Sequence, residues 1–350
     1  MFRKSILFLL LFVTVQLTAP LYGQFDNSGT SVANFLKIGV GARGQALGGA
    51  FTALVDDATA LYWNPAGIAR TQDYQAVFSH TNWIFDLDLT FVGLTIPFES
   101  YGTLGFSLNA LTMGEVDITT PEDPDGTSGL TYDAGDLALG ATYAKKITDR
   151  FYFGFTGKYV REQVANSSAS AFAIDIGTQY VTDFSGLIIG MSIKNFGTKM
   201  RLMGREQLIF VDIDPDLGSN PAVTGRLDTK AWPLPLQFNI GTSMKLYTNE
   251  NMTVTGIFDY NDPRDQNPLY VFGGEWSFSD VIYLRGGYGF RQFGVNYEEI
   301  ENSRSEDTFT LGAGVLTAVP LSNFSIMIDY AYSDLGILNS VQWLTTTLIF

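Results

Sequence analysis

A glycine pattern near the N-terminus has the spacing of a dinucleotide-binding loop. Gly39, Gly41 and Gly44 reproduce G-x-G-x-x-G, which binds a phosphate group when it joins a strand to a long helix and an acidic residue follows about 20 positions later. Here the acidic residues come early, at Asp56 and Asp57, and no alternation of parallel strands and helices follows. We therefore predict that the protein has no nucleotide cofactor.

Ser79 and His80 are the residue types of a nucleophile and its base, and they raise the alternative of a hydrolase on a barrel surface. Neighbours on a strand point to opposite faces, so these two side chains cannot form a dyad with each other. His80 is the only histidine and cysteine is absent, which removes most triad and zinc chemistry. We predict that the protein is not an enzyme.

Two acidic stretches resemble calcium-binding loops. Such a loop needs a glycine at its sixth position and a closing glutamate at its twelfth. In the longer stretch the glycine falls one place late and no glutamate closes the loop, and the shorter stretch is a weaker match. Solvated turns are the simpler interpretation, so we predict no metal site. The stretches are Asp212-x-Asp214-x-Asp216-x-Gly218-x-Asn220 and Asp123-x-Asp125-Gly126.

From Thr71 onward, the elements that would position these residues have the pattern of β-strands. Segments of about ten residues alternate between apolar and polar side chains, as transmembrane strands do. Phe153 and Phe155, for example, fall on the face opposite Thr156 and Lys158. We count about fourteen segments, at 72–83, 87–98, 102–112, 135–147, 151–165, 168–182, 185–196, 234–247, 251–261, 268–278, 280–291, 307–317, 322–333 and 340–350.

The lengths of the connections distinguish a membrane barrel from a soluble sandwich, whose strands also alternate. Outer-membrane barrels have short periplasmic turns and longer outer loops. Every second connection in this chain is short, and the long connections at 113–134, 197–233 and 292–306 have the opposite parity. The sequence therefore predicts that residues 71–350 form a transmembrane antiparallel β-barrel with both termini in the periplasm.

Residues 1–23 have the layout of a secretory signal peptide, with Arg3-Lys4, an apolar core and small residues near Gly23. No later stretch reaches about 18 uninterrupted apolar residues, so a membrane location requires strands that span the bilayer. The net charge of −15 disfavours nucleic acid as a partner. We expect the outer membrane of a Gram-negative bacterium, with membrane lipid around the barrel.

Residues 24–70 are glycine-rich and partly helical, and we expect them to form a compact plug inside the barrel. The stretches 39–51 and 56–69 resemble the N-terminal segment of the PorV/PorQ family of outer-membrane proteins, relatives of FadL-type transporters. The resemblance implies a hatch that fills the periplasmic side of a fourteen-stranded barrel. The motif positions in this chain are Gly39, Gly41, Arg43, Gly48, Gly49, Asp56, Asp57, Asn64, Pro65 and Gly67.

Eight charged residues lie on the polar faces of the predicted strands. An Arg or Lys on the lipid face costs roughly 2–4 kcal/mol at the bilayer midplane, so we expect these side chains to point into the lumen. They either line a solute path or form an ion-pair network that anchors the hatch, and the mixture of both signs favours the network. The residues are Lys158, Asp175, Lys194, Lys245, Asp259, Glu275, Arg285 and Asp329.

The PorV/PorQ resemblance implies a component of the type IX secretion system. Such a protein receives secreted cargo through the cargo's C-terminal sorting domain, delivers it to surface attachment machinery and associates with the translocon. The long loops 113–134 and 197–233 would be its docking surface, because loops on a rigid scaffold carry recognition. The terminal Phe350, a common last residue of such barrels, implies recognition by the barrel-assembly machinery.

Two alternatives remain open from the sequence. A FadL-like transporter of small hydrophobic molecules would have an apolar pocket beside Phe51, Leu54 and Tyr62, whereas a cargo adaptor would have apolar outer loops. A barrel with only a structural role is the third hypothesis. Trp83, Tyr62 and Trp63 are interpreted as interface or packing aromatics.

Overall fold

The computed structural model describes residues 29–212, 223–291, 308–319, 324–336 and 339–350. The predicted signal peptide and most of the longer calcium-like stretch, from Asp214 to Asn220, lie outside these residues. Within the described ranges, no helix is long and apolar enough to cross a membrane.

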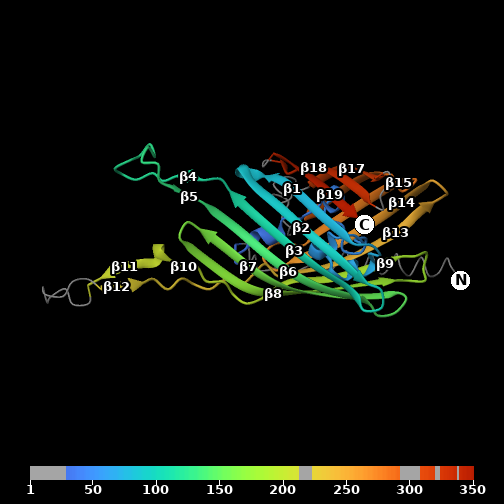
Figure 1. The fold of residues 1–350 in the computed structure, drawn as a ribbon, viewed down its shortest axis with the longest axis horizontal. Coiled ribbons are helices and arrows are strands. Elements are labelled where there is room, and N and C mark those ends of the chain that lie inside the picture. The colour runs from blue at the N-terminus through green and yellow to red at the C-terminus, as the bar shows by residue number, and fades with distance from the viewer. Residues whose placement is uncertain (1–28, 213–222, 292–307, 320–323, 337–338) are drawn as a thin grey trace, which may run out of the picture.

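Fourteen strands form one closed antiparallel barrel (Figure 1), which confirms the predicted fold class. Each strand pairs with its neighbours in chain order, β19 pairs with β1, and β9 pairs with both β8 and β13. The strands are β1 (Gln75–Trp83), β2 (Leu87–Phe98), β3 (Gly102–Met113), β6 (Ala134–Lys146), β7 (Phe151–Val164), β8 (Ser167–Val181), β9 (Ile188–Gly197), β13 (Gln237–Thr248), β14 (Met252–Pro263), β15 (Leu269–Phe278), β16 (Ile282–Arg291), β17 (Thr308–Ala318), β18 (Ser325–Asp334) and β19 (Ser340–Ile349).

The two faces of the barrel wall follow from the period of two along each strand. In β8, Phe172 is 68% exposed, while its neighbours Ala171 and Ala173 are buried. Asp175 is also buried on the inner face, between the exposed side chains of Ile174 and Ile176. The outer face is thus apolar, and the polar face forms the lumen, as expected of a barrel in lipid.

Two of the long connections carry short strands of their own at one end of the barrel; the predicted long connection at 292–306 lies outside the described residues. Between β3 and β6 lies the hairpin of β4 (Val116–Asp117) and β5 (Thr131–Tyr132). Between β9 and β13 lie β10 (Met203–Gly204), which pairs with the end of β8, the helix η4 (Arg205–Gln207), and the hairpin of β11 (Leu208–Val211) and β12 (Val223–Arg226). Both hairpins project beyond the barrel wall (Figure 1).

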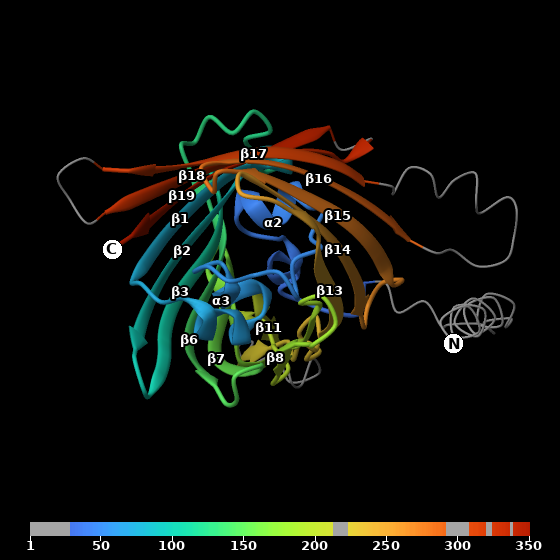
Figure 2. The ribbon, with the colours of Figure 1, turned by 90° about the vertical axis from the view of Figure 1, so that its right-hand side faces the viewer.

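The N-terminal segment, residues 29–70, lies inside the ring of strands (Figure 2). It contains η1 (Asn34–Lys37), α2 (Ala42–Ala46), α3 (Ala60–Trp63) and η2 (Pro65–Arg70); a further short helix, η3 (Ile84–Asp86), joins β1 to β2. The apolar side chains of the N-terminal segment, among them Phe51 and Ile68, form one buried cluster with wall residues such as Phe91 and Val271. The core of this barrel therefore lies between the N-terminal segment and the inner wall.

Glycines in the wall let the N-terminal segment approach the strands closely. A Cβ added to Gly154 would lie 2.3 Å from the carbonyl carbon of Pro65, and one on Gly177 would lie 1.9 Å from Oδ1 of Asn64. Both distances are shorter than a real Cβ contact allows. The Asn64-Pro65 turn therefore rests directly on the backbone of β7 and β8.

Candidate functional site

The first group of lumenal charges joins the N-terminal segment to three strands. The guanidinium group of Arg43 donates to both carboxylate oxygens of Glu275 at 3.0 and 3.2 Å and to Asp56 and Asp57 at 2.8 and 2.9 Å. Burial lowers the pKa of Arg43, but the three carboxylates outweigh it and hold this pKa well above its ordinary value. Arg43 is therefore a permanent cation that ties α2 to β15.

Arg285 extends this group across the wall. Its Nε donates to Glu275 at 2.7 Å and its Nη1 donates to Asp329 at 2.6 Å, and the Arg285 side chain has no exposed surface. Glu275 thus lies between two guanidinium groups, one from the N-terminal segment and one from β16. Mixed signs with direct contacts are what a buried charge requires.

Polar side chains of the wall also hold the backbone of the N-terminal segment. Asp259 accepts hydrogen bonds from the N–H groups of Phe51 and Thr52 at 3.1 and 2.9 Å. The side-chain amide of Gln179 donates to the carbonyl of Val55 at 2.9 Å. Irregular backbone inside a barrel needs such partners, because its N–H and C=O groups are otherwise unsatisfied.

The Asn64-Pro65 turn is held by the side chain of Asn64, which is fully buried. Its Nδ2 donates to the carbonyl of Thr52 at 2.8 Å and to that of Thr178 at 3.1 Å, and its Oδ1 accepts from the N–H of Ala66. Pro65 follows at the first position of η2, where a missing N–H does no harm.

The glycines of the motif allow the backbone conformations and close contacts of the N-terminal segment. Gly41, Gly48 and Gly49 have φ values of 80°, 70° and 89°, in the region that L side chains rarely adopt. The carbonyl of Gly39 accepts from Trp343 Nε1 at 3.2 Å, and a Cβ on Gly67 would lie 2.6 Å from a carbonyl oxygen.

The remaining lumenal lysines have three different environments. Lys158 pairs with Asp175 at 2.8 Å on the neighbouring strand. Lys194 is 4% exposed, and its Nζ lies 4.5 Å from the ring centre of Tyr62 and 5.5 Å from that of Trp63. Lys245 is exposed near the short-turn end of β13 and has no ion pair among the described residues.

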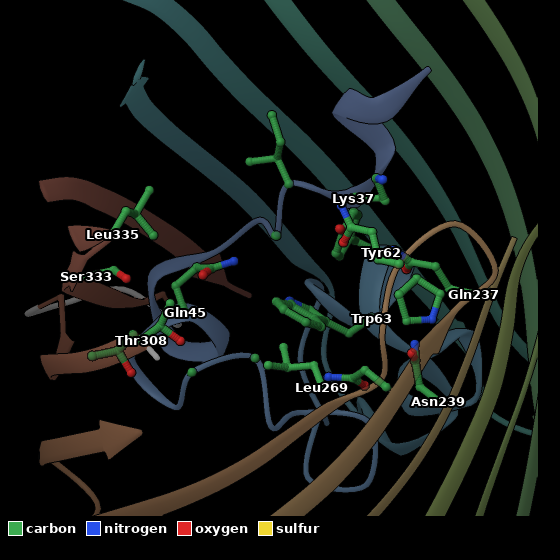
Figure 3. Close-up of a pocket in the computed structure, with 18 of the residues that line it drawn as sticks. Lys37, Gln45, Tyr62, Trp63, Gln237, Asn239, Leu269, Thr308, Ser333 and Leu335 are labelled. Carbon is green, nitrogen blue, oxygen red and sulfur yellow. The ribbon is translucent and has the colours of Figure 1, made fainter. Parts of the chain in front are cut away.

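A cavity of about 370 Å³ lies in the lumen between the N-terminal segment and the end of the barrel that carries the long connections (Figure 3). Tyr62 and Trp63 enter it from α3, Lys37 from η1, and Gln237 and Asn239 from β13. Trp83 also lines it. Trp63 belongs to the same buried cluster as Phe51 and Leu54, and Tyr62 packs against it. These two aromatics therefore pack against the core and line the cavity as well.

A second cavity, of about 630 Å³, lies beside the first long connection and is mainly apolar. Leu111 and Met113 of β3 line it together with Met200, Leu202 and Trp232 of the connection between β9 and β13. It is the apolar pocket that a transporter would need, at a different place from the one predicted.

The start of the N-terminal segment is tied to the turn between β14 and β15. Lys37 Nζ donates to Asp265 at 2.8 Å, and the hydroxyl of Ser31 donates to the same oxygen. Burial raises the pKa of Asp265, but these two donors outweigh it and hold the pKa below its usual value. The carboxylate is therefore ionised at neutral pH. The alternation of side chains along the strands did not predict this ion pair between Lys37 and Asp265.

The other candidate residues are placed as follows. Ser79 is buried on the inner face of β1, while His80 lies on the outer face, 3.0 Å from Asn82. Asp123 closes its own turn by accepting from Thr127 and Ser128, which lowers its pKa. No group of three or more His, Cys, Asp or Glu residues in the described ranges could hold a metal ion.

The terminal Phe350 closes the barrel seam. Its N–H and C=O pair with those of Tyr74 at 3.0 Å, and the two rings stack at 5.8 Å.

Sequence reasoning missed two wall residues that hold the N-terminal segment. The side-chain amide of Gln179 donates to the carbonyl of Val55, and the backbone carbonyl of Thr178 accepts from the side chain of Asn64. Sequence reasoning also missed Asn239 and Asn261 in the cavity. Their only signal is a polar side chain with inward parity near a strand end, and many lumenal residues share that signal.

Comparison with solved structures shows the fold. A deletion mutant of the TodX monoaromatic hydrocarbon channel is 13% identical, with 89% of this chain and 98% of that chain covered and a TM-score of 0.53. The toluene transporter TodX of Pseudomonas putida is 11% identical, with 89% and 96% covered and a TM-score of 0.50. A FadL homologue of Pseudomonas aeruginosa is 12% identical over 88% and 97%, with a TM-score of 0.49. No curated protein matches the chain.

A protein family described as type IX secretion system protein PorV matches residues 23–221, more than half of the chain. Barrel and family together imply the outer membrane of a Gram-negative bacterium. This chain belongs to the PorV family of the type IX secretion system.

Proposed function

We propose that the protein is a non-enzymatic adaptor of type IX secretion, which binds secreted cargo and passes it to the surface attachment machinery. The family supports a role in this system. The observation that carries the adaptor role is the hairpin β11–β12, which projects beyond the barrel (Figure 1). Its Phe210 is 81% exposed, and an exposed aromatic side chain on a projecting element is typical of a recognition surface.

The apolar character extends over two of the long connections, the one between β9 and β13 and the one between β3 and β6. Leu208 and Leu227 are exposed near Phe210, and Leu130 is exposed beside the hairpin β4–β5. Apolar loops are what we expected of a cargo adaptor, since a solute transporter has no need of them. The proposed docking surface is the β11–β12 hairpin, with the β4–β5 hairpin as its second part.

One observation favours a second candidate function, the uptake of small hydrophobic molecules. The apolar cavity of about 630 Å³ beside Leu111 and Met113 is of the size that encloses a small ligand. Under this alternative, the N-terminal segment would move to open a path. The ion pairs of Arg43 and the hydrogen bonds of Asn64 oppose such movement, and we therefore rank the adaptor first.

The test is affinity purification of the tagged protein from its native outer membrane, with mass spectrometry of what is recovered. An adaptor should recover secreted proteins that share a C-terminal sorting domain, together with a very large translocon barrel. The variant Phe210→Ser should reduce this recovery about tenfold, as loss of a central aromatic contact does.

Phe85→Ser is the matched control. Phe85 is 80% exposed at the same end of the barrel, but it lies in η3 between β1 and β2. Recovery should be unchanged in this variant. Recovery of the barrel alone with bound hydrocarbon would instead support the transporter.

A further inference from the structure

The cavity beside Tyr62 and Trp63 is cationic, although the protein carries a net charge of −15. Among the described residues that line it, Lys37, Lys194 and Arg291 are positively charged, and no aspartate or glutamate is present. Such a cavity attracts an anion despite the negative net charge of the protein.

Two of these cations already have defined partners. Lys37 is paired with Asp265 at 2.8 Å, and Arg291 donates to the carbonyl of Asn267 at 2.5 Å. The side chain of Lys194 makes no hydrogen bond and no ion pair with any described residue. Lys194 differs in this from two other lumenal cations, Lys158 and Arg285, which both form ion pairs.

Lys194 forms no ion pair with the carboxylates of the neighbouring wall that the structure describes. Of the carboxylates that act on it through space, Asp175 is held by Lys158 and by the N–H of Asn195 at 2.7 Å. Asp259 accepts hydrogen bonds from two N–H groups of the N-terminal segment at Oδ2. Its Oδ1 is buried without a hydrogen-bond partner, yet it forms no ion pair with Lys194 among the described residues. The rings of Tyr62 and Trp63 stabilise the ammonium group, but they do not replace a hydrogen-bond acceptor.

The rest of the lining is rich in side-chain amides. An amide both donates and accepts hydrogen bonds, so a ring of amides suits a polar body with peptide or hydroxyl groups better than an alkyl chain. The amide residues are Asn34, Gln45, Gln237, Asn239, Asn261 and Gln266.

We propose that this cavity binds a carboxylate at Lys194, carried on a polar body such as the C-terminal end of a polypeptide or a small organic acid. A buried ammonium group without an acceptor is unfavourable, and a carboxylate would supply a charge-assisted hydrogen bond. The volume of about 370 Å³ is within the range of small-ligand sites. This site is separate from the loop surface proposed for cargo, so either proposal can fail alone.

The test uses the full mature protein in detergent micelles and the fluorescence of its tryptophans, because Trp63, Trp83 and Trp343 line the cavity. The probes are N-acetyl-trialanine with a free carboxylate, the same peptide as its C-terminal amide, and succinate. The free acid should bind at least about tenfold more tightly than the amide, as expected for one hydrogen bond to a charged group.

Variants assign the effect to Lys194. Lys194→Met should abolish the preference for the acid, and Lys194→Arg should retain it. Lys245→Met is the matched control, since Lys245 lies outside the cavity, and it should leave the preference unchanged. Thermal unfolding of each variant checks that the barrel is intact.

Binding of the peptide acid without succinate would identify polypeptide ends as the source of the carboxylate, and binding of succinate would identify small acids. Equal affinity for acid and amide would overturn the proposal. So would failure of both acids to bind, or an acid preference that persists in Lys194→Met.

Discussion

Two buried cations of the barrel wall, Arg285 on β16 and Lys194 on β9, have opposite surroundings. Arg285 is held by Glu275 at 2.7 Å and Asp329 at 2.6 Å, and through Glu275 it is linked to Arg43. Lys194 has only two aromatic rings and an open cavity beside it. The comparison shows that a lumenal charge can fasten the N-terminal segment to the wall or remain available for a ligand.

The largest expected effect is the difference in the free energy of unfolding between Arg285→Met and Lys194→Met, which replace the two cations by the same apolar side chain. Arg285→Met would leave Glu275 and Asp329 buried with one cation fewer, and breaking a buried ion pair costs about 3–5 kcal/mol. Lys194→Met removes a charge that has no ion-pair partner, so the free energy of unfolding should change little or increase. Urea unfolding, followed by the mobility shift of folded barrels on gels, measures both.

Arg150→Met is the control for the loss of a charged pair as such. Arg150 pairs with Asp183 at an exposed turn, where ion pairs contribute little, and its unfolding midpoint should be that of the wild type. Equal destabilisation by Arg285→Met and Lys194→Met would contradict the claim that Arg285 stabilises the fold through ion pairs and Lys194 does not.

A smaller effect is expected where the N-terminal segment meets the wall without any charge. Gly154→Ala places a Cβ against the backbone of Pro65, and overpacking of this kind costs about 1–3 kcal/mol. If the segment closes the lumen as a hatch, its displacement should also raise ion conductance in planar bilayers.

Gly157→Ala provides the comparison on the same strand, because a Cβ at Gly157 would meet nothing within 4 Å. It should leave conductance and stability unchanged. Removal of residues 39–69 should give the upper limit of conductance, and a tight barrel after that deletion would rule out a hatch.

The smallest effect concerns the tie between Lys37 and Asp265. Because folding lowers the pKa of Asp265, the tie contributes stability above the ordinary aspartate pKa of about 3.9 and loses it as the pH falls through the lower folded value. Asp265→Asn should therefore reduce hydrogen-exchange protection of residues 32–37 at pH 7, and the difference between wild type and variant should shrink as the pH falls below the ordinary aspartate pKa and disappear once the folded carboxylate is protonated. A difference that persists at low pH would mean that this carboxylate does not hold η1.

The alternation of side chains determined the strands, because a barrel in lipid must place apolar groups outside and polar groups inside at every second residue. Phe153 and Thr156 suffice to orient β7, and the predicted ends of the strands differ from the observed ones by only a few residues. The small and helical residues after Gly39 likewise marked a segment distinct from the wall.

The tertiary structure alone decided which charges meet. Lys158 and Lys194 have the same inward parity and look alike in the sequence. The register of β7 against β8, in which Thr156 lies opposite Asp175, gives Lys158 its carboxylate, and the position of α3 gives Lys194 two rings instead. The register and tilt of the strands and the path of residues 29–70 set the distances between these lysines and their partners. The alternation of side chains along a strand contains no information about any of the three.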